Sequence, residues 1–263
     1  MKKLLLAGLL VAWLAPVAAM AQDAFNGTWK FELDNAQFPK KPDVFLLKDG
    51  MYQCKTCMPP IDVKADGSDQ TVTGHPYFNS VSIKVVDDRT IEETDKKDGK
   101  TVATSKTTVS PDGKTAMFAF SDSSNTNADP VTGSGESLRV AAGPAGSHAI
   151  SGSWRVAKLN NLSENGLLVT YKVDGDMFSM STPTGQSYVA KLDGTEAPYK
   201  GDPGTTSVSV KKINKNTIEE TDMRDGKVIS LARMTVAADG KSVTYAVTDK
   251  LHGTNSQFTA QKQ

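Results

Sequence analysis

The feature that most constrains this chain is an internal duplication. Residues 90–95 read Thr-Ile-Glu-Glu-Thr-Asp, and residues 217–222 repeat the same six amino acids. When residues 81–122 are aligned with residues 208–249 at a fixed offset of 127, 19 of 42 positions are identical and no gap is needed. A match of that quality does not arise by chance. We therefore expect the chain to contain two copies of one structural unit.

Inside each copy, apolar and polar residues alternate, which is the period of a half-buried β-strand. Residues 167–173 and 243–247 show this alternation clearly, and no stretch beyond residue 21 has a sustained helical period. Asp-Gly pairs, which suit the positive φ angles of tight hairpins, separate the alternating stretches. They fall at matching places in the two copies: Asp49-Gly50, Asp66-Gly67, Asp98-Gly99 and Asp112-Gly113, then Asp174-Gly175, Asp193-Gly194, Asp225-Gly226 and Asp239-Gly240. This pattern predicts an all-β protein of two tandem antiparallel up-and-down barrels, each with about eight to ten strands.

The boundaries of the two copies follow from where the repeat opens and where a linker interrupts it. A Gly-x-Trp sequence followed by a basic residue opens both copies, at Trp29 and at Trp154. Residues 141–149 are small and lack periodicity, as expected of a linker. We therefore assign residues 22–140 to the first β-barrel repeat and residues 150–263 to the second. Both Trp side chains are expected to be buried structural residues near a barrel end.

Residues 1–21 have the composition of a signal peptide. Lys2 and Lys3 precede an apolar run, which ends in a small-residue cleavage site before Gln22. No other stretch approaches the roughly 20 apolar residues that a membrane span requires. We predict an exported bacterial protein of the periplasm, with secretion beyond it as a second outcome. The mature chain would carry 28 basic and 30 acidic residues, interspersed and with a formal charge of −2. This balance argues against a nucleic-acid partner, because such partners are bound by basic surfaces.

Several longer sequence motifs resemble those of a known family. The opening Gly-Thr-Trp and residues 188–194, 208–213 and 216–222 resemble secreted bacterial proteins with tandem lipocalin-like (calycin-like) repeats. The resemblance covers nearly the whole mature chain. It implies an exported protein in which each copy is a lipocalin-like barrel with its Trp plugging one end. It brings no assigned activity and no site residues.

The sequence contains two cysteines, in a Cys-x-x-Cys arrangement. In an oxidising compartment the first expectation is a local disulfide between Cys54 and Cys57. Copper is an alternative, since Cu(I) prefers sulfur ligands. The candidate ligands are Met51, Cys54, Cys57 and Met58, with Met177 and Met180 in the second copy. A thioredoxin-type site would need a helix N-terminus, for which the sequence gives no signal. A structural zinc site would need a second pair of ligands.

Two Glu-Glu pairs, at residues 92–93 and 219–220, raise the question of an acidic group inside each barrel. Adjacent residues of a strand face opposite sides, so one Glu of each pair points inward if the barrel is closed. An inward Glu could contact a ligand or act as a general acid or base. The favoured interpretation is a rim strand with both faces in water, on which Lys106 and Arg233 are the cross-strand charge partners.

The sequence contains no recognisable catalytic constellation. The three histidines, His75, His148 and His252, match no metal or triad spacing and are expected to be surface or loop residues. We predict no catalytic residue, metal or cofactor, and a non-enzymatic protein that binds a small apolar or amphipathic ligand. Such binding requires a cavity of at least roughly 300 Å³ in one barrel. The alternatives are a structural or interaction protein of the bacterial envelope with packed barrels, and copper binding through Cys54 and Cys57.

Overall fold

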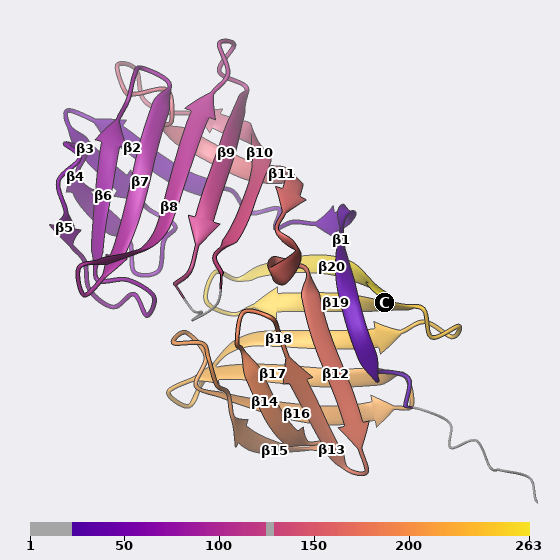
Figure 1. Cartoon of the computed structure of the whole chain (residues 1–263). Helices are drawn as coiled ribbons and strands as arrows, with labels where there is room; N and C mark the ends of the chain where they lie inside the picture. The colour runs from indigo at the N-terminus through magenta and orange to yellow at the C-terminus, as the bar shows by residue number, and fades with distance from the viewer. Residues whose placement is uncertain (1–22, 125–128) are drawn as a thin grey trace, which may run out of the picture.

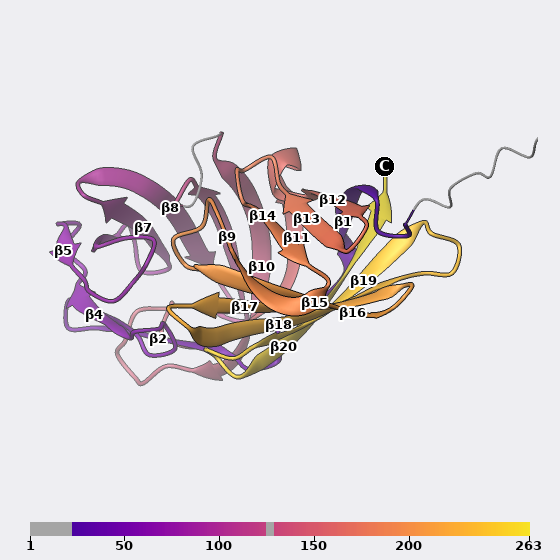
Figure 2. The ribbon, with the colours of Figure 1, turned by 90° about the horizontal axis from the view of Figure 1, so that it is seen from below.

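The protein consists of two β-barrels, according to a computed structural model that describes residues 23–124 and 129–263. The predicted signal peptide, residues 1–21, lies outside the described residues. In the described part of the chain, twenty strands form two ten-stranded antiparallel sheets. Each sheet curves into a nearly closed barrel, and the two barrels lie side by side (Figure 1 and Figure 2). The predicted all-β fold of two antiparallel barrels is therefore confirmed.

Barrel 1 is formed by ten strands that follow one another in the sequence. They are β2 (Asp43–Lys48), β3 (Met51–Cys54), β4 (Ile61–Lys64), β5 (Gln70–Thr71), β6 (Ser80–Val85), β7 (Thr90–Lys97), β8 (Lys100–Val109), β9 (Thr115–Asp122), β10 (Val131–Ala142) and β11 (Gly152–Leu162). Strand β11 pairs with both β10 and β2. The sheet is therefore continuous from β4 through β2, β11 and β10 to β5.

Barrel 2 is formed by nine strands of the C-terminal half and one strand from the N-terminus. They are β12 (Leu168–Asp174), β13 (Met177–Ser181), β14 (Ser187–Lys191), β15 (Asp193–Pro198), β16 (Ser207–Asn214), β17 (Thr217–Arg224), β18 (Lys227–Val236), β19 (Ser242–Asp249), β20 (Thr254–Lys262) and β1 (Gly27–Gln37). Strand β1 pairs with β12 on one side and β20 on the other. Reciprocal backbone hydrogen bonds of 3.0 and 2.9 Å between Ser187 and Lys200 join the sheet's two ends.

The barrels do not coincide with the two sequence repeats, which corrects the expectation that each copy folds by itself. The first strand of the first copy, β1, completes barrel 2, and the first strand of the second copy, β11, completes barrel 1. Residues 141–149 therefore do not link two barrels, because they form the end of β10 and most of the connection from β10 to β11 within barrel 1. The chain passes between the barrels at residues 38–42 and 163–167.

The connections account for this exchange of strands. Residues 38–42 read Phe-Pro-Lys-Lys-Pro, and proline both fixes its own φ and keeps the preceding residue extended. Such a segment is poorly suited to a tight hairpin between β1 and β2, so β1 continues away from barrel 1. The second crossing contains the short 3-10 helix η1 (Glu164–Gly166). Its Glu164 pairs with Lys30 of β1 at 3.1 Å.

Three of the predicted Asp-Gly turns adopt the geometry expected of two-residue hairpins. Asp49, Asp98 and Asp225 have φ angles of 52°, 52° and 51°, and the glycine after each also has a positive φ. Positive φ at both central positions gives a turn whose twist matches that of the flanking strands. These turns connect β2 to β3, β7 to β8 and β17 to β18, which fixes the register of those pairs.

Matching loops of the two copies meet where the barrels touch. The hydroxyl group of Tyr77, in the β5–β6 loop, donates a hydrogen bond of 2.9 Å to Asp202 in the β15–β16 loop. A Cβ atom on Gly204 would lie 2.0 Å from the Tyr77 hydroxyl oxygen, so this contact requires a glycine. Lys41, in the first crossing, donates a hydrogen bond of 2.7 Å to the carbonyl oxygen of His252.

Each barrel has a buried Trp at the end where its chain enters. Trp29 is 0% exposed and donates its indole N–H to the carbonyl of Phe25, four residues earlier, at 2.9 Å. Trp154 is 3% exposed and makes the same bond to Ile150 at 2.7 Å. A cation covers each ring: the Arg139 guanidinium lies 4.0 Å from the centroid of Trp154, and the Lys262 ammonium lies 5.1 Å from that of Trp29. The two Trp side chains are thus in equivalent environments, but in exchanged barrels.

We predict that Trp29→Ala unfolds barrel 2, because Trp29 packs there even though it belongs to the first copy. Trp154→Ala should unfold barrel 1, and each change should lower the free energy of unfolding by about 3 to 5 kcal/mol. Hydrogen exchange measured by mass spectrometry on peptides from β6–β8 and β16–β18 distinguishes the barrels. Faster exchange of β6–β8 in Trp29→Ala would contradict the strand exchange.

Candidate functional site

The interior of each barrel contains a cavity large enough for a small molecule. Cavity 1, in barrel 1, has a volume of about 430 Å³, and cavity 2, in barrel 2, has a volume of about 410 Å³. Both exceed the lower bound of roughly 300 Å³ for ligand pockets. The barrels are therefore not filled completely by their own side chains.

Cavity 1 has mainly apolar and aromatic walls. Its large apolar side chains are Phe45, Tyr52, Ile91, Phe118, Trp154 and Val156. The ring of Phe118 can lie against β10 because residue 135 is glycine, where a Cβ would be 2.4 Å from the ring. The acidic and basic side chains in the wall are Asp43, Glu93 and His252. His252 comes from the β19–β20 connection, so barrel 2 contributes to the wall of cavity 1.

The two Glu residues of each pair have opposite roles, which corrects the interpretation of a rim strand with both faces in water. Glu92 faces outward and forms ion pairs with Lys84 at 3.3 Å and with Lys106 at 3.5 Å. These partners lower the pKa of Glu92. In the second copy Glu219 likewise pairs with Arg233. The inward members are Glu93, which lines cavity 1, and Glu220, which lines cavity 2.

Glu93 is a half-buried carboxyl group on the inner surface of barrel 1, and it makes no hydrogen bond to another described residue. Its strand neighbour on the cavity side is Ile91, and its cross-strand neighbours are Ile83 and Ser105. Burial raises the pKa of Glu93 to about 8, with a further contribution from the charge of Asp95. Glu93 is therefore mainly protonated at neutral pH, because an ionised carboxylate is poorly solvated there.

Glu220 has a partner that Glu93 lacks. The hydroxyl group of Tyr188 donates a hydrogen bond to the Glu220 carboxyl group. Burial and the charge of Asp222 raise the pKa of Glu220 to about 8, while the hydrogen bond from Tyr188 acts in the opposite direction. The sequence did not indicate this contact, because Tyr188 and Glu220 lie on strands that are not neighbours in the sheet.

A second inward carboxyl group follows each inward Glu along the strand. Burial raises the pKa of Asp95 to about 7, with a contribution from the charge of Asp122. Burial also raises the pKa of Asp222 to about 6, although hydrogen bonds with Glu220 and Ser230 lower it. One carboxyl oxygen of Asp95 is buried without a hydrogen-bond partner in the described structure. The two-residue period of the sequence could have identified Asp95 and Asp222, because they are two residues from an inward Glu.

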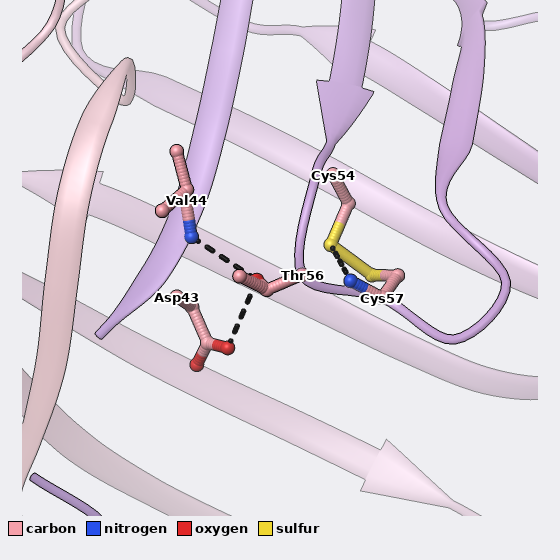
Figure 3. Close-up of a disulfide and its surroundings, with 5 residues drawn as sticks. All are labelled: Asp43, Val44, Cys54, Thr56 and Cys57. Atoms are coloured by element: carbon pink, nitrogen blue, oxygen red, sulfur yellow. Dashed lines mark hydrogen bonds between the residues drawn. A yellow bond between two sulfur atoms is a disulfide. The ribbon is translucent and has the colours of Figure 1, made fainter. Parts of the chain in front are cut away.

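The predicted disulfide pair lies in the wall of cavity 1. The Sγ atoms of Cys54 and Cys57 are 2.05 Å apart, at disulfide distance (Figure 3). Between them, Thr56 accepts a hydrogen bond from the backbone N–H of Val44 and donates one to Asp43, both at 3.1 Å. These bonds hold the Cys-x-x-Cys turn against the first residues of β2, beside the cavity.

The structure does not bring the candidate copper ligands together as free sulfur groups. Cys54 and Cys57 are paired with each other, Met51 and Met58 are exposed, and Met180 is buried in barrel 2. Among residues 23–124 and 129–263, no group of three or more His, Cys, Asp or Glu side chains is arranged to hold a metal ion. A thiol-based copper site would require reduction of the cysteine pair.

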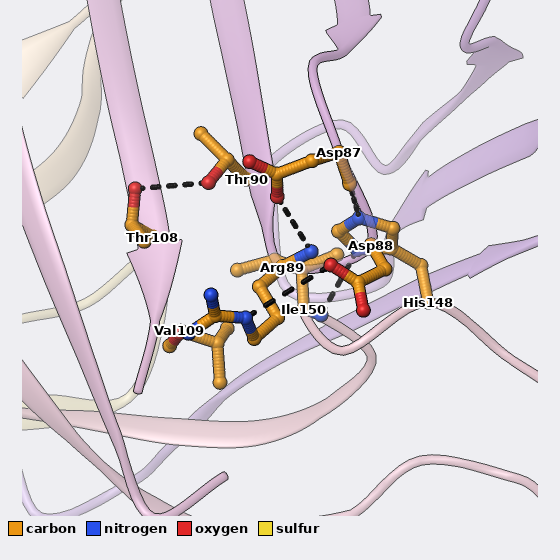
Figure 4. A network of polar contacts seen from close by, with 8 residues as sticks. All are labelled: Asp87, Asp88, Arg89, Thr90, Thr108, Val109, His148 and Ile150. Atoms are coloured by element: carbon orange, nitrogen blue, oxygen red, sulfur yellow. Dashed lines mark hydrogen bonds and ion pairs between the residues drawn. The ribbon is translucent and has the colours of Figure 1, made fainter. Parts of the chain in front are cut away.

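The three histidines lie in separate places. The ring of His75 stacks on Phe78 with centroids 4.7 Å apart. His148 fixes the β10–β11 connection, since one ring nitrogen lies 2.7 Å from the carbonyl oxygen of Asp87 and the other accepts the Ile150 N–H at 3.1 Å (Figure 4). His252 contacts Asp249 at 2.6 Å. Of these three side chains, His252 lines cavity 1.

No protein-family model matches the chain, and no curated protein is detectably similar to it. The described residues include no helix with the length and apolar character that a membrane crossing requires.

The buried carboxyl groups predict that the protein is more stable in mild acid than in mild base. A carboxyl group whose pKa is higher in the folded state stabilises the fold fully below its unfolded pKa, about 4, and loses that contribution as the pH rises through its folded pKa. The folded values here lie at about 6 for Asp222, about 7 for Asp95 and about 8 for Glu93 and Glu220. The free energy of unfolding should therefore decrease from about pH 4 to pH 8, by up to about 1.4 kcal/mol per pH unit for each proton.

Denaturant unfolding over this pH range measures the effect. Glu93→Gln, whose amide resembles the protonated carboxyl group, should reduce the slope, whereas Glu92→Gln should not reduce it. Equal slopes for wild type and Glu93→Gln would contradict the assignment of Glu93 as a buried neutral acid.

Proposed function

We propose that this is an exported, non-enzymatic protein that binds a small amphipathic ligand inside barrel 1. The observation that carries the proposal is cavity 1 itself, about 430 Å³ with aromatic and aliphatic walls. Ligand sites of proteins are typically apolar cavities that contain a few polar groups. Cavity 1 has this composition, and its polar groups include Glu93, the hydroxyl group of Tyr52 and the hydroxyl group of Ser105. The lipocalin-like resemblance of the sequence favours the same function.

Cavity 1 is favoured over cavity 2 because its inward carboxyl group is free to bind. In cavity 2 the corresponding Glu220 already accepts a hydrogen bond from Tyr188. Cavity 2 is also lined by Phe120, Asp122 and Val131, which belong to β9 and β10 of barrel 1.

The proposal of export rests on the first 21 residues and on the cysteine pair. Lys2 and Lys3 before an apolar run are typical of a signal peptide. A disulfide between Cys54 and Cys57 is stable in an oxidising compartment such as the bacterial periplasm and is uncommon in the cytosol. A periplasmic location is therefore proposed, with binding of a small molecule there as the function.

Binding in cavity 1 predicts that a bulky side chain placed in the cavity blocks an apolar probe. Ser105 faces the cavity, whereas its strand neighbour Thr104 is exposed on the outer surface. Ser105→Phe should weaken binding of the neutral dye N-phenylnaphthylamine at least about tenfold, a loss of 1.4 kcal/mol. Thr104→Phe is the matched control and should bind as the wild type does. Dye fluorescence and quenching of Trp154, which lines the cavity, measure the affinity. Equal affinity in all three proteins would contradict the proposal.

Export predicts both the N-terminus and the bonding of the cysteines. Intact mass spectrometry of protein expressed in a bacterium should show a chain that begins at Gln22. Neither Cys54 nor Cys57 should react with an alkylating reagent until a reductant is added. A retained N-terminus would overturn the export proposal, and alkylation of both thiols without reduction would overturn the disulfide.

A further inference from the structure

The carboxyl group of Glu93 is a polar group without a partner in a largely apolar cavity. It lines cavity 1 and forms no hydrogen bond to any residue in the described ranges. The Glu93 side chain is half-buried and borders the hollow interior of barrel 1, so its carboxyl group is open to a ligand in the cavity. Tyr52 also lines the cavity, and its hydroxyl group makes no hydrogen bond within the described structure. Burial and then the charge of Glu93 raise the pKa of Tyr52, which therefore stays a neutral donor.

The duplication provides an internal comparison for Glu93. In barrel 2 the corresponding Glu220 is bonded to Tyr188, which lies on β14. The corresponding position of β4 in barrel 1 is Ile61, which is 4% exposed and has no polar group. The two barrels thus contain the same inward acid at equivalent positions, with an internal partner in barrel 2 and without one in barrel 1. In barrel 1 the partner must come from solvent or from a ligand.

The charges around cavity 1 favour a cation. The titratable groups that face Glu93 from the surrounding elements are Asp95 on its own strand, Tyr52 on β3, Asp43 at the start of β2 and His252 from barrel 2. No Lys or Arg of the described ranges lines the cavity. The acidic groups Asp43 and Glu93 outnumber the one basic lining group, His252, and an excess of acidic groups attracts a cation. The aromatic rings of Phe45 and Phe118 add a cation–π attraction.

We propose that the ligand of cavity 1 is a small amine, whose protonated amino group contacts Glu93 and whose apolar body packs against the aromatic walls. This inference rests on the ligand-binding function proposed above and specifies its chemical class. The ammonium group donates a hydrogen bond to the Glu93 carboxylate, and the Tyr52 hydroxyl group is available as a second polar contact. Charge-assisted hydrogen bonds of this kind are stronger than neutral ones, especially in a medium of low polarity.

Binding of an amine is coupled to the release of a proton. An aliphatic amine enters as an ammonium ion, whereas Glu93 in the empty cavity is mainly protonated at neutral pH, since its pKa is raised to about 8. Formation of the ion pair breaks the O–H bond of Glu93, and that proton passes to the solvent. The affinity for an amine should therefore increase as the pH rises toward about 8, and then level off.

Three probes with one aromatic body and different head groups test the proposal: naphthylmethylamine, naphthylmethanol and naphthoate. At neutral pH the wild-type protein should bind the amine at least about tenfold more tightly than the alcohol, the size of one charge-assisted hydrogen bond, and the acid most weakly. Glu93→Gln should remove the preference for the amine. Glu92→Gln, whose side chain lies outside the barrel, is the matched control and should keep the preference.

Calorimetry in buffers of different ionisation enthalpy gives a second measurement that needs no variant. The wild-type protein should release about one proton for each molecule of amine bound near pH 7, and no proton on binding the alcohol. Equal affinities for the amine and the alcohol would overturn the amine proposal, and so would amine binding without proton release. If the neutral dye still binds in that case, the proposed ligand-binding function stands. Failure of the dye and of all three probes to bind would overturn both.

Discussion

Backbone hydrogen bonding of β1 to β12 and β20 is the interaction on which the rest of the structure depends. Without β1, barrel 2 would have two open edges with unpaired N–H and C=O groups between its C-terminal strand and β12. Because β1 comes from the N-terminus, barrel 2 closes only when the two ends of the chain meet. Barrel 1 has no such requirement, since all its strands are consecutive. The exchange therefore makes one barrel contiguous and leaves the other dependent on the whole chain.

Closure by ten strands also explains why the barrels are hollow. A barrel of about eight strands is just wide enough for its side chains to fill, and the diameter grows with the number of strands. In barrel 1 the end near Trp154 is sealed, because the Arg139 guanidinium covers the ring and donates hydrogen bonds of 2.6 Å to the carbonyl oxygens of Ala149 and Ser151. The remaining space is cavity 1, whose mainly apolar walls contain the inward carboxyl group of Glu93.

The two copies use one framework for different interiors. On the outer surface both acids form ion pairs with basic side chains: Glu92 pairs with lysines and Glu219 pairs with an arginine. On the inner surface they differ, because Tyr188 satisfies Glu220 whereas Ile61 offers nothing to Glu93. The strand framework tolerates this difference, since it is held by backbone hydrogen bonds that do not involve these side chains. A difference at one inward position, Tyr188 against Ile61, therefore accompanies the difference between an acid with an internal partner and one without.

The sequence by itself determined the strands, the hairpins and the number of barrels. Two-residue periodicity and Asp-Gly turns are local properties, and the 127-residue offset established that the fold is built twice. The same periodicity allowed one inward Glu in each pair, but the favoured interpretation from the sequence was a rim strand with both Glu residues in water, because closure of the barrel is not a local property. The tertiary structure decided which barrel receives β1, because β1 and β11 carry the same Gly-x-Trp pattern and backbone pairing does not discriminate between them. The contact between Tyr188 and Glu220 was also decided by the tertiary structure. It crosses the barrel interior, so it depends on the curvature of the sheet, and a local pattern of residues does not specify that curvature.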